Sequence, residues 1–331
     1  MTTTHAPITR SALTLEDVPA LTALLNRIDV ADQLGEPVQE PSVREWLTSP
    51  ELDLPRDTRA LRAGEELIGV AIVDVHAAVD RDGRVRCQLM GGVDPEHRRQ
   101  GRGTELLDWS EARALELARA RHGSAENAVL RIGGGRDPQE GSGPGGAEVR
   151  PLLERRGYRR ARSWLVMSCA LPASAPAAVD GAEIIAPTDA LREATHAAHL
   201  AAFADHWGSA PISAERWNRF WSAHTARREL SSIARDDRGT VLAYVLTDED
   251  VPGVLHIALV GTRPEARGRG LARAAIAHSL AAGSAAGFAR AELEVDAESL
   301  TGATRLYDAL GFVRESVVAT FEKPAAGDDA P

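Results

Sequence analysis

One short motif occurs twice in the chain, and each copy stands between an apolar run and a long amphipathic stretch. The copies read DPEHRRQGRG at 94–103 and RPEARGRGLA at 263–272, so both contain the spacing Pro-Glu-x-Arg-x-x-Gly. A Gly-rich turn leading from a strand into a helix presents backbone N–H groups at the positive end of the helix dipole. Such a turn favours a phosphate or pyrophosphate. Two of them predict one domain repeated in tandem.

A second landmark supports the repeat. LERRGY at 153–158 matches YDALGF at 307–312. The first copy is longer between its landmarks, and the Gly- and Pro-rich segment 133–146 accounts for the extra length. This segment is too polar to build a core, which predicts a mobile loop. Because no Gly-Lys-Ser/Thr closes it, we do not interpret it as a nucleotide-binding loop.

The bulk properties fit two ordinary domains. The chain has 331 residues, of which 44% are hydrophobic, so each half can bury a core. The net charge of −10 argues against a nucleic-acid partner. Cys87 and Cys169 are expected to be buried thiols, with no disulfide and no metal. Since neither a leader nor a membrane-spanning run is present, we expect a cytoplasmic protein without a membrane partner, either monomer or homodimer.

The apolar periodicity predicts the same order of elements twice, which gives an α/β (α+β layered) fold. Thr14 and Asp17 mark the start of the first helix as a capping box. We expect a first domain at 8–171, a linker at 172–181, a second domain at 182–323 and a tail at 324–331. The first half should hold helices at 12–28, 41–47, 103–121 and 149–156, with strands near 60–61 and at 67–77, 85–93, 128–132 and 163–171. The second half should hold helices at 190–203, 214–223, 269–285 and 301–310, with strands at 182–185, 230–234, 241–247, 254–262, 291–295 and 317–322.

At this point both halves resemble the GNAT acetyltransferases, through the turn pattern and through the helix end at 306–312. The tandem arrangement is similar to mycothiol synthase and related actinobacterial double-domain acetyltransferases. The resemblance implies two twisted mixed sheets flanked by helices, each splayed to hold acetyl-CoA. Backbone groups of the strand before the turn would pair with pantetheine, and the turn would bind the pyrophosphate. These cofactor positions are Val260, Gly261, Thr262, Arg267, Gly268, Arg269, Gly270, Leu271, Ala272, Arg273 and Ser299, with Arg98, Arg99, Gln100, Gly101, Arg102, Gly103 and Thr104 in the first half.

The same resemblance assigns the chemistry to the second half. Tyr307 stands where the family often has a tyrosine that protonates the CoA sulfur, although it could merely pack there. His256 occupies the usual position of a glutamate base, and its alternative role is that of a hydrogen-bonding strand residue. Acidic alternatives for the base on the next strand are Glu292, Glu294 and Asp296. Leu153 and Cys87 hold the equivalent positions in the first half, which predicts a silent domain, with or without bound acetyl-CoA.

An aromatic segment of the second half is the candidate acceptor site. Asp205, His206, Trp207, Trp217 and Trp221 combine aromatic walls with a carboxylate, which suits an amine, but the stripe could equally be core. We therefore predict an acetyl-CoA-dependent N-acetyltransferase in which a primary amine of a small molecule attacks the thioester directly. The alternatives are a non-catalytic acyl-CoA-binding or sensing protein, and a protein lysine or N-terminal acetyltransferase.

Overall fold

The computed structural model describes residues 7–136, 149–172, 179–298 and 302–325. The chain forms two compact units. The N-terminal unit contains Met1–Ala161 and Val318–Pro331, and the C-terminal unit contains Arg162–Val317. In the part of the chain that the structure describes, no helix combines the length and the apolar character needed to cross a bilayer.

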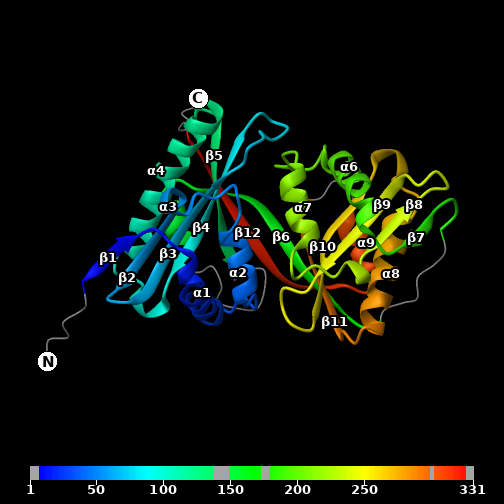
Figure 1. Ribbon diagram of the computed structural model, residues 1–331, viewed down its shortest axis with the longest axis horizontal. Coiled ribbons are helices and arrows are strands. Elements are labelled where there is room, and N and C mark those ends of the chain that lie inside the picture. Colours follow the sequence, from blue (N-terminus) through cyan, green and yellow to red (C-terminus); the bar gives the residue numbers. More distant parts are fainter. Residues whose placement is uncertain (1–6, 137–148, 173–178, 299–301, 326–331) are drawn as a thin grey trace. The chain divides into compact units, whose positions relative to one another are not determined.

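The N-terminal unit is a mixed sheet covered by helices on both faces (Figure 1). The strands are antiparallel except for the parallel pair β4–β5. Both faces of β3 are buried, and its sequence is correspondingly an almost continuous apolar run. The sheet order is β1 (Ile8–Ser11), β2 (Thr58–Ala63), β3 (Glu66–Val75), β4 (Val85–Val93), β5 (Ala128–Arg136) and the end of β12 (Val313–Pro324). The helices are α1 (Val18–Asp32), α2 (Glu40–Leu47), the short α3 (Leu54–Asp57), α4 (Arg102–His122) and α5 (Val149–Arg155).

The C-terminal unit repeats this plan. Its strands are antiparallel except for the parallel pair β10–β11. Helices α6 and α7 pack on one face of the sheet, and α8 and α9 pack on the other. The sheet order is β7 (Glu183–Ile185), β8 (Ser232–Arg235), β9 (Val241–Asp248), β10 (Val254–Thr262), β11 (Arg290–Asp296) and β6 (Arg159–Ala170). The helices are α6 (Arg192–Phe203), α7 (Ala214–Ser222), α8 (Leu271–Ala285) and α9 (Ala303–Asp308).

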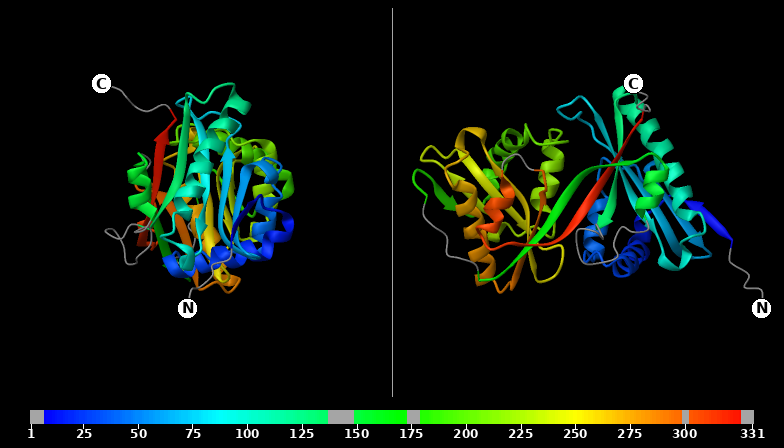
Figure 2. Two further views of the ribbon diagram at one scale, coloured as in Figure 1. Left: turned by 90° about the vertical axis from the view of Figure 1, so that its left-hand side faces the viewer. Right: turned by 180° about the vertical axis from the view of Figure 1, so that it is seen from behind.

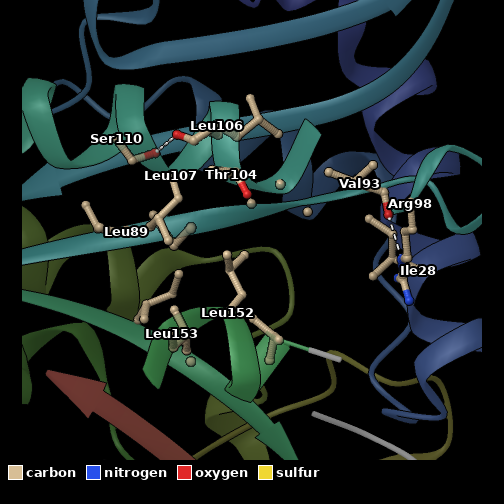
Figure 3. Close-up of a pocket in the computed structure, with 18 of the residues that line it drawn as sticks. Ile28, Leu89, Val93, Arg98, Thr104, Leu106, Leu107, Ser110, Leu152 and Leu153 are labelled. Atoms are coloured by element: carbon tan, nitrogen blue, oxygen red, sulfur yellow. Dashed lines mark hydrogen bonds between the residues drawn. The ribbon is translucent and has the colours of Figure 1, made fainter. Parts of the chain in front are cut away.

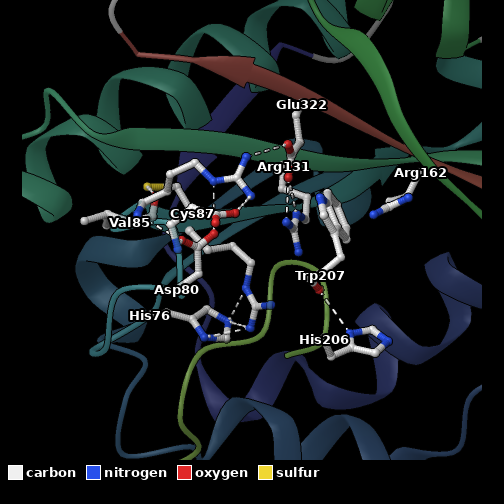
Figure 4. Close-up of polar contacts among 12 residues, drawn as sticks. His76, Asp80, Val85, Cys87, Arg131, Arg162, His206, Trp207 and Glu322 are labelled. Carbon is white, nitrogen blue, oxygen red and sulfur yellow. Dashed lines mark hydrogen bonds and ion pairs between the residues drawn. The ribbon is translucent and has the colours of Figure 1, made fainter. Parts of the chain in front are cut away.

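Strands β6 and β12 each begin in one unit and end in the other. The end of β6 pairs with β11, from Asp296 opposite Trp164 to Arg290 opposite Ala170. The end of β12 pairs with β5 (Figure 2), where Arg131 and Glu322 form an ion pair of 2.5 Å (Figure 4). The segments 8–171 and 182–323 expected from the sequence would keep all of β6 in the first domain and nearly all of β12 in the second. In the structure, the end of β6 belongs to the C-terminal unit and the end of β12 belongs to the N-terminal unit. The alternation of apolar residues predicts which side chains of β6 and β12 are buried. It cannot predict which of the two sheets each strand joins, because the same side chains would be buried in either sheet.

Most predicted elements are present within a few residues. The capping box is confirmed, because the Thr14 backbone N–H donates to the Asp17 carboxylate at 2.9 Å. The sequence missed β1, an edge strand with a single apolar residue, and the four-residue helix α3. The segment predicted as a loop at 133–146 begins as the end of β5, and residues 137–148 lie outside the described part of the chain.

Candidate functional site

The two predicted turns have the same backbone conformation. Gly101 and Gly270 both lie in the left-handed region, with φ of 80° and 78°. Arg99 has φ of 62° where the second turn has Gly268 at 75°, and a left-handed arginine costs roughly 1–2 kcal/mol. The two glycines are the N-cap residues of α4 and α8, and no side chain caps either helix. The backbone N–H groups in the first turn of α4 and of α8 are therefore not capped by a side chain, an arrangement that suits an anion.

The arginine of each turn binds an aspartate of its own unit. The guanidinium of Arg267 donates to both carboxylate oxygens of Asp205, at 2.8 and 3.1 Å. Arg98 binds Asp32 in the same bidentate way, at 2.7 and 2.9 Å. The hydrogen bond from Arg267 lowers the pKa of the Asp205 carboxyl. Each pair holds a turn against the segment at the end of the unit's first long helix.

The sheet of each unit opens next to its turn. Strand β10 pairs with β11 only from Val254 to His256 among the described residues, and β4 pairs with β5 only from Val85 to Leu89. Beyond these points, one backbone edge of β10 and of β4 has no strand partner in the described part of the chain. An irregularity in the β9–β10 register, between Ile257 and Leu259, accompanies the opening in the C-terminal unit. An open edge of this kind suits an extended amide chain such as pantetheine.

A cavity of about 480 Å³ fills the opening of the N-terminal unit (Figure 3). Its lining includes residues 89–93 of β4, the turn residues Arg98, Arg99 and Gly101, and Thr104 at the start of α4. Leu89, Leu107, Leu152 and Leu153 make its inner wall apolar (Figure 3). The sequence marked these turn residues as a cofactor site but gave no sign of the cavity, whose volume depends on how α4 and α5 pack.

Gly91 on β4 shapes the same cavity. Its φ is 145°, and a Cβ there would lie 2.1 Å from the Val70 carbonyl oxygen. A side chain would therefore push β3 and β4 apart.

The C-terminal unit brings together three titratable side chains at the ends of β9 and β10. His256 Nδ1 lies 2.9 Å from Asp248 Oδ1, and the two residues are partners across the antiparallel strands. One ligand atom from each of Asp248, Asp250 and His256 lies within 4.8 Å of the others. Burial opposes the charged imidazole, but the hydrogen bond and charge of Asp248, with Glu294 and Asp250 nearby, raise the pKa of His256 overall. The carboxylates thus stabilise a proton on this imidazole.

Tyr307 on α9 is buried in the core of the C-terminal unit. Its ring meets Phe312 edge-to-face, with centroids 5.8 Å apart. Burial raises the pKa of its phenol to about 12, so the hydroxyl stays protonated at neutral pH. Among the acidic alternatives to His256, Glu292 is paired with Arg290 at 2.5 Å, and Asp296 accepts the backbone N–H of Glu298. Ser299 lies outside the described residues.

The matching positions of the N-terminal unit hold no acid or base at neutral pH. Leu153 is fully buried in the core. Burial raises the pKa of the Cys87 thiol to about 12, which keeps it protonated.

The structure separates the five predicted acceptor residues. Trp217 and Trp221 are 1% and 2% exposed, and their indole N–H groups donate to the Arg192 carbonyl and to Asp189. Trp221 also lines a small cavity, whereas Trp217 packs in the core between α6, α7 and β9. The other three lie together after α6, where Asp205 binds Arg267, His206 contacts the Trp207 carbonyl, and Trp207 receives a cation–π contact from Arg162 (Figure 4).

Comparison with known proteins agrees with this geometry. Residues 191–312, within the C-terminal unit, match the model of the acetyltransferase (GNAT) family, and the chain as a whole has the fold of tandem GNAT proteins. A GCN5-related N-acetyltransferase from Sphaerobacter thermophilus is 27% identical, with a TM-score of 0.73 and 96% of both chains covered. A tandem GNAT protein from the clavulanic acid biosynthesis pathway shares the fold at 16% identity, with a TM-score of 0.72, 98% of this chain covered and 100% of that chain. A search of curated proteins finds no match.

Proposed function

We propose that the protein transfers an acetyl group from acetyl-CoA to a primary amine of a small molecule, with the chemistry in the C-terminal unit. The observation that carries the proposal is the Asp248–His256 pair, which lies where β10 leaves β11. The family match falls within this unit, and Tyr307 on α9 adds a protonated phenol.

The residues suit direct attack by the amine. Neutral His256 accepts a proton from the acceptor ammonium, and Asp248 stabilises the resulting imidazolium. The free amine attacks the thioester carbonyl, and N–H groups of the open β10 edge stabilise the oxyanion. When the C–S bond breaks, the CoA thiolate is stabilised by the hydroxyl of Tyr307, which donates a hydrogen bond or its proton. The attacking nitrogen releases its second proton to solvent, which leaves a neutral amide, and solvent returns a proton to Tyr307 where the phenol has given one to the thiolate.

The N-terminal cavity supports a second role, namely binding of a CoA thioester without transfer. Its turn has the same backbone conformation as the C-terminal turn, and its lining includes residues 89–93 of β4. Neither Leu153 nor the Cys87 thiol supplies a proton acceptor. A chain in which only this role operated would be an acyl-CoA-binding protein rather than an enzyme.

A matched pair of variants distinguishes the two units. A Cβ at Gly101 or at Gly270 meets no atom within 4 Å, so valine at either position acts mainly through the unfavourable positive φ. We expect Gly270→Val to abolish CoA thiol release with a panel of amines and Gly101→Val to retain it. Calorimetry with acetyl-CoA should lose one binding event in each variant. The opposite pattern of release would assign the chemistry to the N-terminal unit, and binding without release from any amine would favour the non-catalytic role or a protein acceptor.

A further inference from the structure

The cavity of the N-terminal unit extends well past the turn that suits a phosphate. Figure 3 shows Arg98 at one end of the cavity and Leu89, Leu107, Leu153 and Ser110 at the other, which we call the inner end. Ser110 lies more than two turns into α4. The binding role described above needs only the turn and the edge of β4. The inner end therefore has no assigned ligand.

The side chains at the inner end are apolar apart from one hydroxyl. The three leucines are buried. The Ser110 hydroxyl donates to the Leu106 carbonyl oxygen at 2.8 Å, within its own helix. Leu153 stands at the position of Tyr307 in the C-terminal unit, so an aliphatic side chain replaces a phenol. These walls suit an apolar part of a ligand, because a polar part would lose its hydrogen bonds to water without gaining new ones from these side chains.

Small residues form the sheet side of the cavity beneath α4. Gly91 pairs with Ala71 across β4 and β3, and both line the cavity. A Cβ at Gly91 would clash with the backbone of β3, so this position has to remain a glycine. In the alignment of the two turn motifs, the corresponding pair of the C-terminal unit is Val260 and Val245. On the sheet side, the N-terminal unit thus has one methyl group where the C-terminal unit has two isopropyl groups.

The pairing of β4 indicates where a thioester would lie. Strand β4 pairs with β5 up to Leu89, which lies opposite Ile132. An extended pantetheine that follows the open edge of β4 from Val93 reaches Leu89, and β5 occupies the edge beyond it. The acyl group then continues into the inner end, between Leu107 and Leu153. An acetyl group supplies only one methyl to these walls, whereas a longer chain would cover them.

We propose that the N-terminal unit binds a CoA thioester whose unbranched acyl chain is longer than acetyl, with the chain held at the inner end. The proposal rests on the binding role proposed above for this cavity, and it specifies the ligand class as medium-chain acyl-CoA. The ligand is bound and not converted, since the matching positions hold neither an acid nor a base.

Calorimetry with a series of thioesters tests the proposal on the full chain. In Gly270→Val, which leaves the N-terminal turn intact, affinity should rise from acetyl-CoA through butanoyl-CoA to hexanoyl-CoA. Each buried methylene contributes up to about fourfold in affinity, so hexanoyl-CoA should bind at least about tenfold more tightly than acetyl-CoA. The heat-capacity change of binding should become more negative along the series. Equal affinities, or a preference for hexanoyl-CoA that persists in Gly101→Val and is absent from Gly270→Val, would overturn the proposal.

Two substitutions at Ser110 distinguish filling of the inner end from loss of the hydroxyl. In the Gly270→Val background, Ser110→Met places a flexible side chain there, and the preference for hexanoyl-CoA over acetyl-CoA should fall to about threefold or less. Ser110→Ala removes the same hydroxyl without filling the space, so the preference should persist. Unacylated CoA should bind both variants alike and so reports an intact turn. A preference that is unchanged in Ser110→Met would contradict the proposed place of the chain.

Free hexanoate separates an acyl-CoA site from a fatty-acid site. Without the CoA moiety it should bind at least about tenfold more weakly than hexanoyl-CoA, and equal binding would reject the proposal. The binding role and the chain-length preference are also separable. Equal binding of acetyl-CoA and hexanoyl-CoA that is lost in Gly101→Val would retain the role and reject the preference. Absence of binding by CoA and by every thioester in Gly270→Val would reject the role itself.

Discussion

Replacing Asp248 by asparagine should move the titration of His256 to lower pH. The 2.9 Å contact is a charge-assisted hydrogen bond, worth about 1.5–3 kcal/mol. Because one pKa unit corresponds to about 1.36 kcal/mol, losing most of this contribution lowers the imidazole pKa by about 1–2 units. Asparagine keeps the size of the side chain, so the effect reports charge rather than packing.

This lower pKa should be visible in the acid limb of the pH profile of kcat/KM. A base must be deprotonated, so activity in wild type should rise with pH through a His256 pKa above 6.5. In Asp248→Asn the limb should move down by about 1–2 units, while the plateau falls about tenfold because the imidazole is no longer held in one tautomer. The assay is CoA thiol release between pH 5 and 9, with the His256 ring protons followed by NMR as a readout independent of turnover. An unchanged limb and an unchanged NMR titration, with Asp237→Asn as the charge control, would refute the reasoning.

Three further predictions concern stability. Gly91→Ala should lower the free energy of unfolding by about 2–4 kcal/mol in urea titrations, since its Cβ meets a backbone oxygen, whereas Gly83→Ala, with φ of 76° and open space, should cost about 1 kcal/mol. Burial lowers the pKa of His199 from 6.5 to about 4, so stability should fall by up to about 3 kcal/mol as pH drops through that window, and His199→Gln should flatten the dependence. Ending the chain at Val317 should remove hydrogen-exchange protection from β5, while ending it at Ala325 should not.

The sequence was sufficient for features whose cause is local. Both turns and their left-handed glycines are encoded in the motifs at 94–103 and 263–272, and the helices are encoded in the amphipathic stretches that follow. The Asp248–His256 contact could also have been found, because a short loop between antiparallel strands fixes which residues face each other. Asp32 and Asp205 escaped notice as partners of the turn arginines because each pair joins positions far apart in the chain. Both cavities depend on how helices pack over a sheet edge, and no local pattern encodes that volume.

The exchange of β6 and β12 also has a consequence for the order in which the protein is made. The N-terminal unit is translated first, yet its sheet lacks the strand that pairs with β5 until residues 318–324 have left the ribosome. In the C-terminal unit, by contrast, β6 has already been synthesised when its partner β11 leaves the ribosome. The half that begins synthesis should therefore be the last to complete its fold, and a ribosome stalled within the second repeat would leave β5 exposed as an unpaired edge.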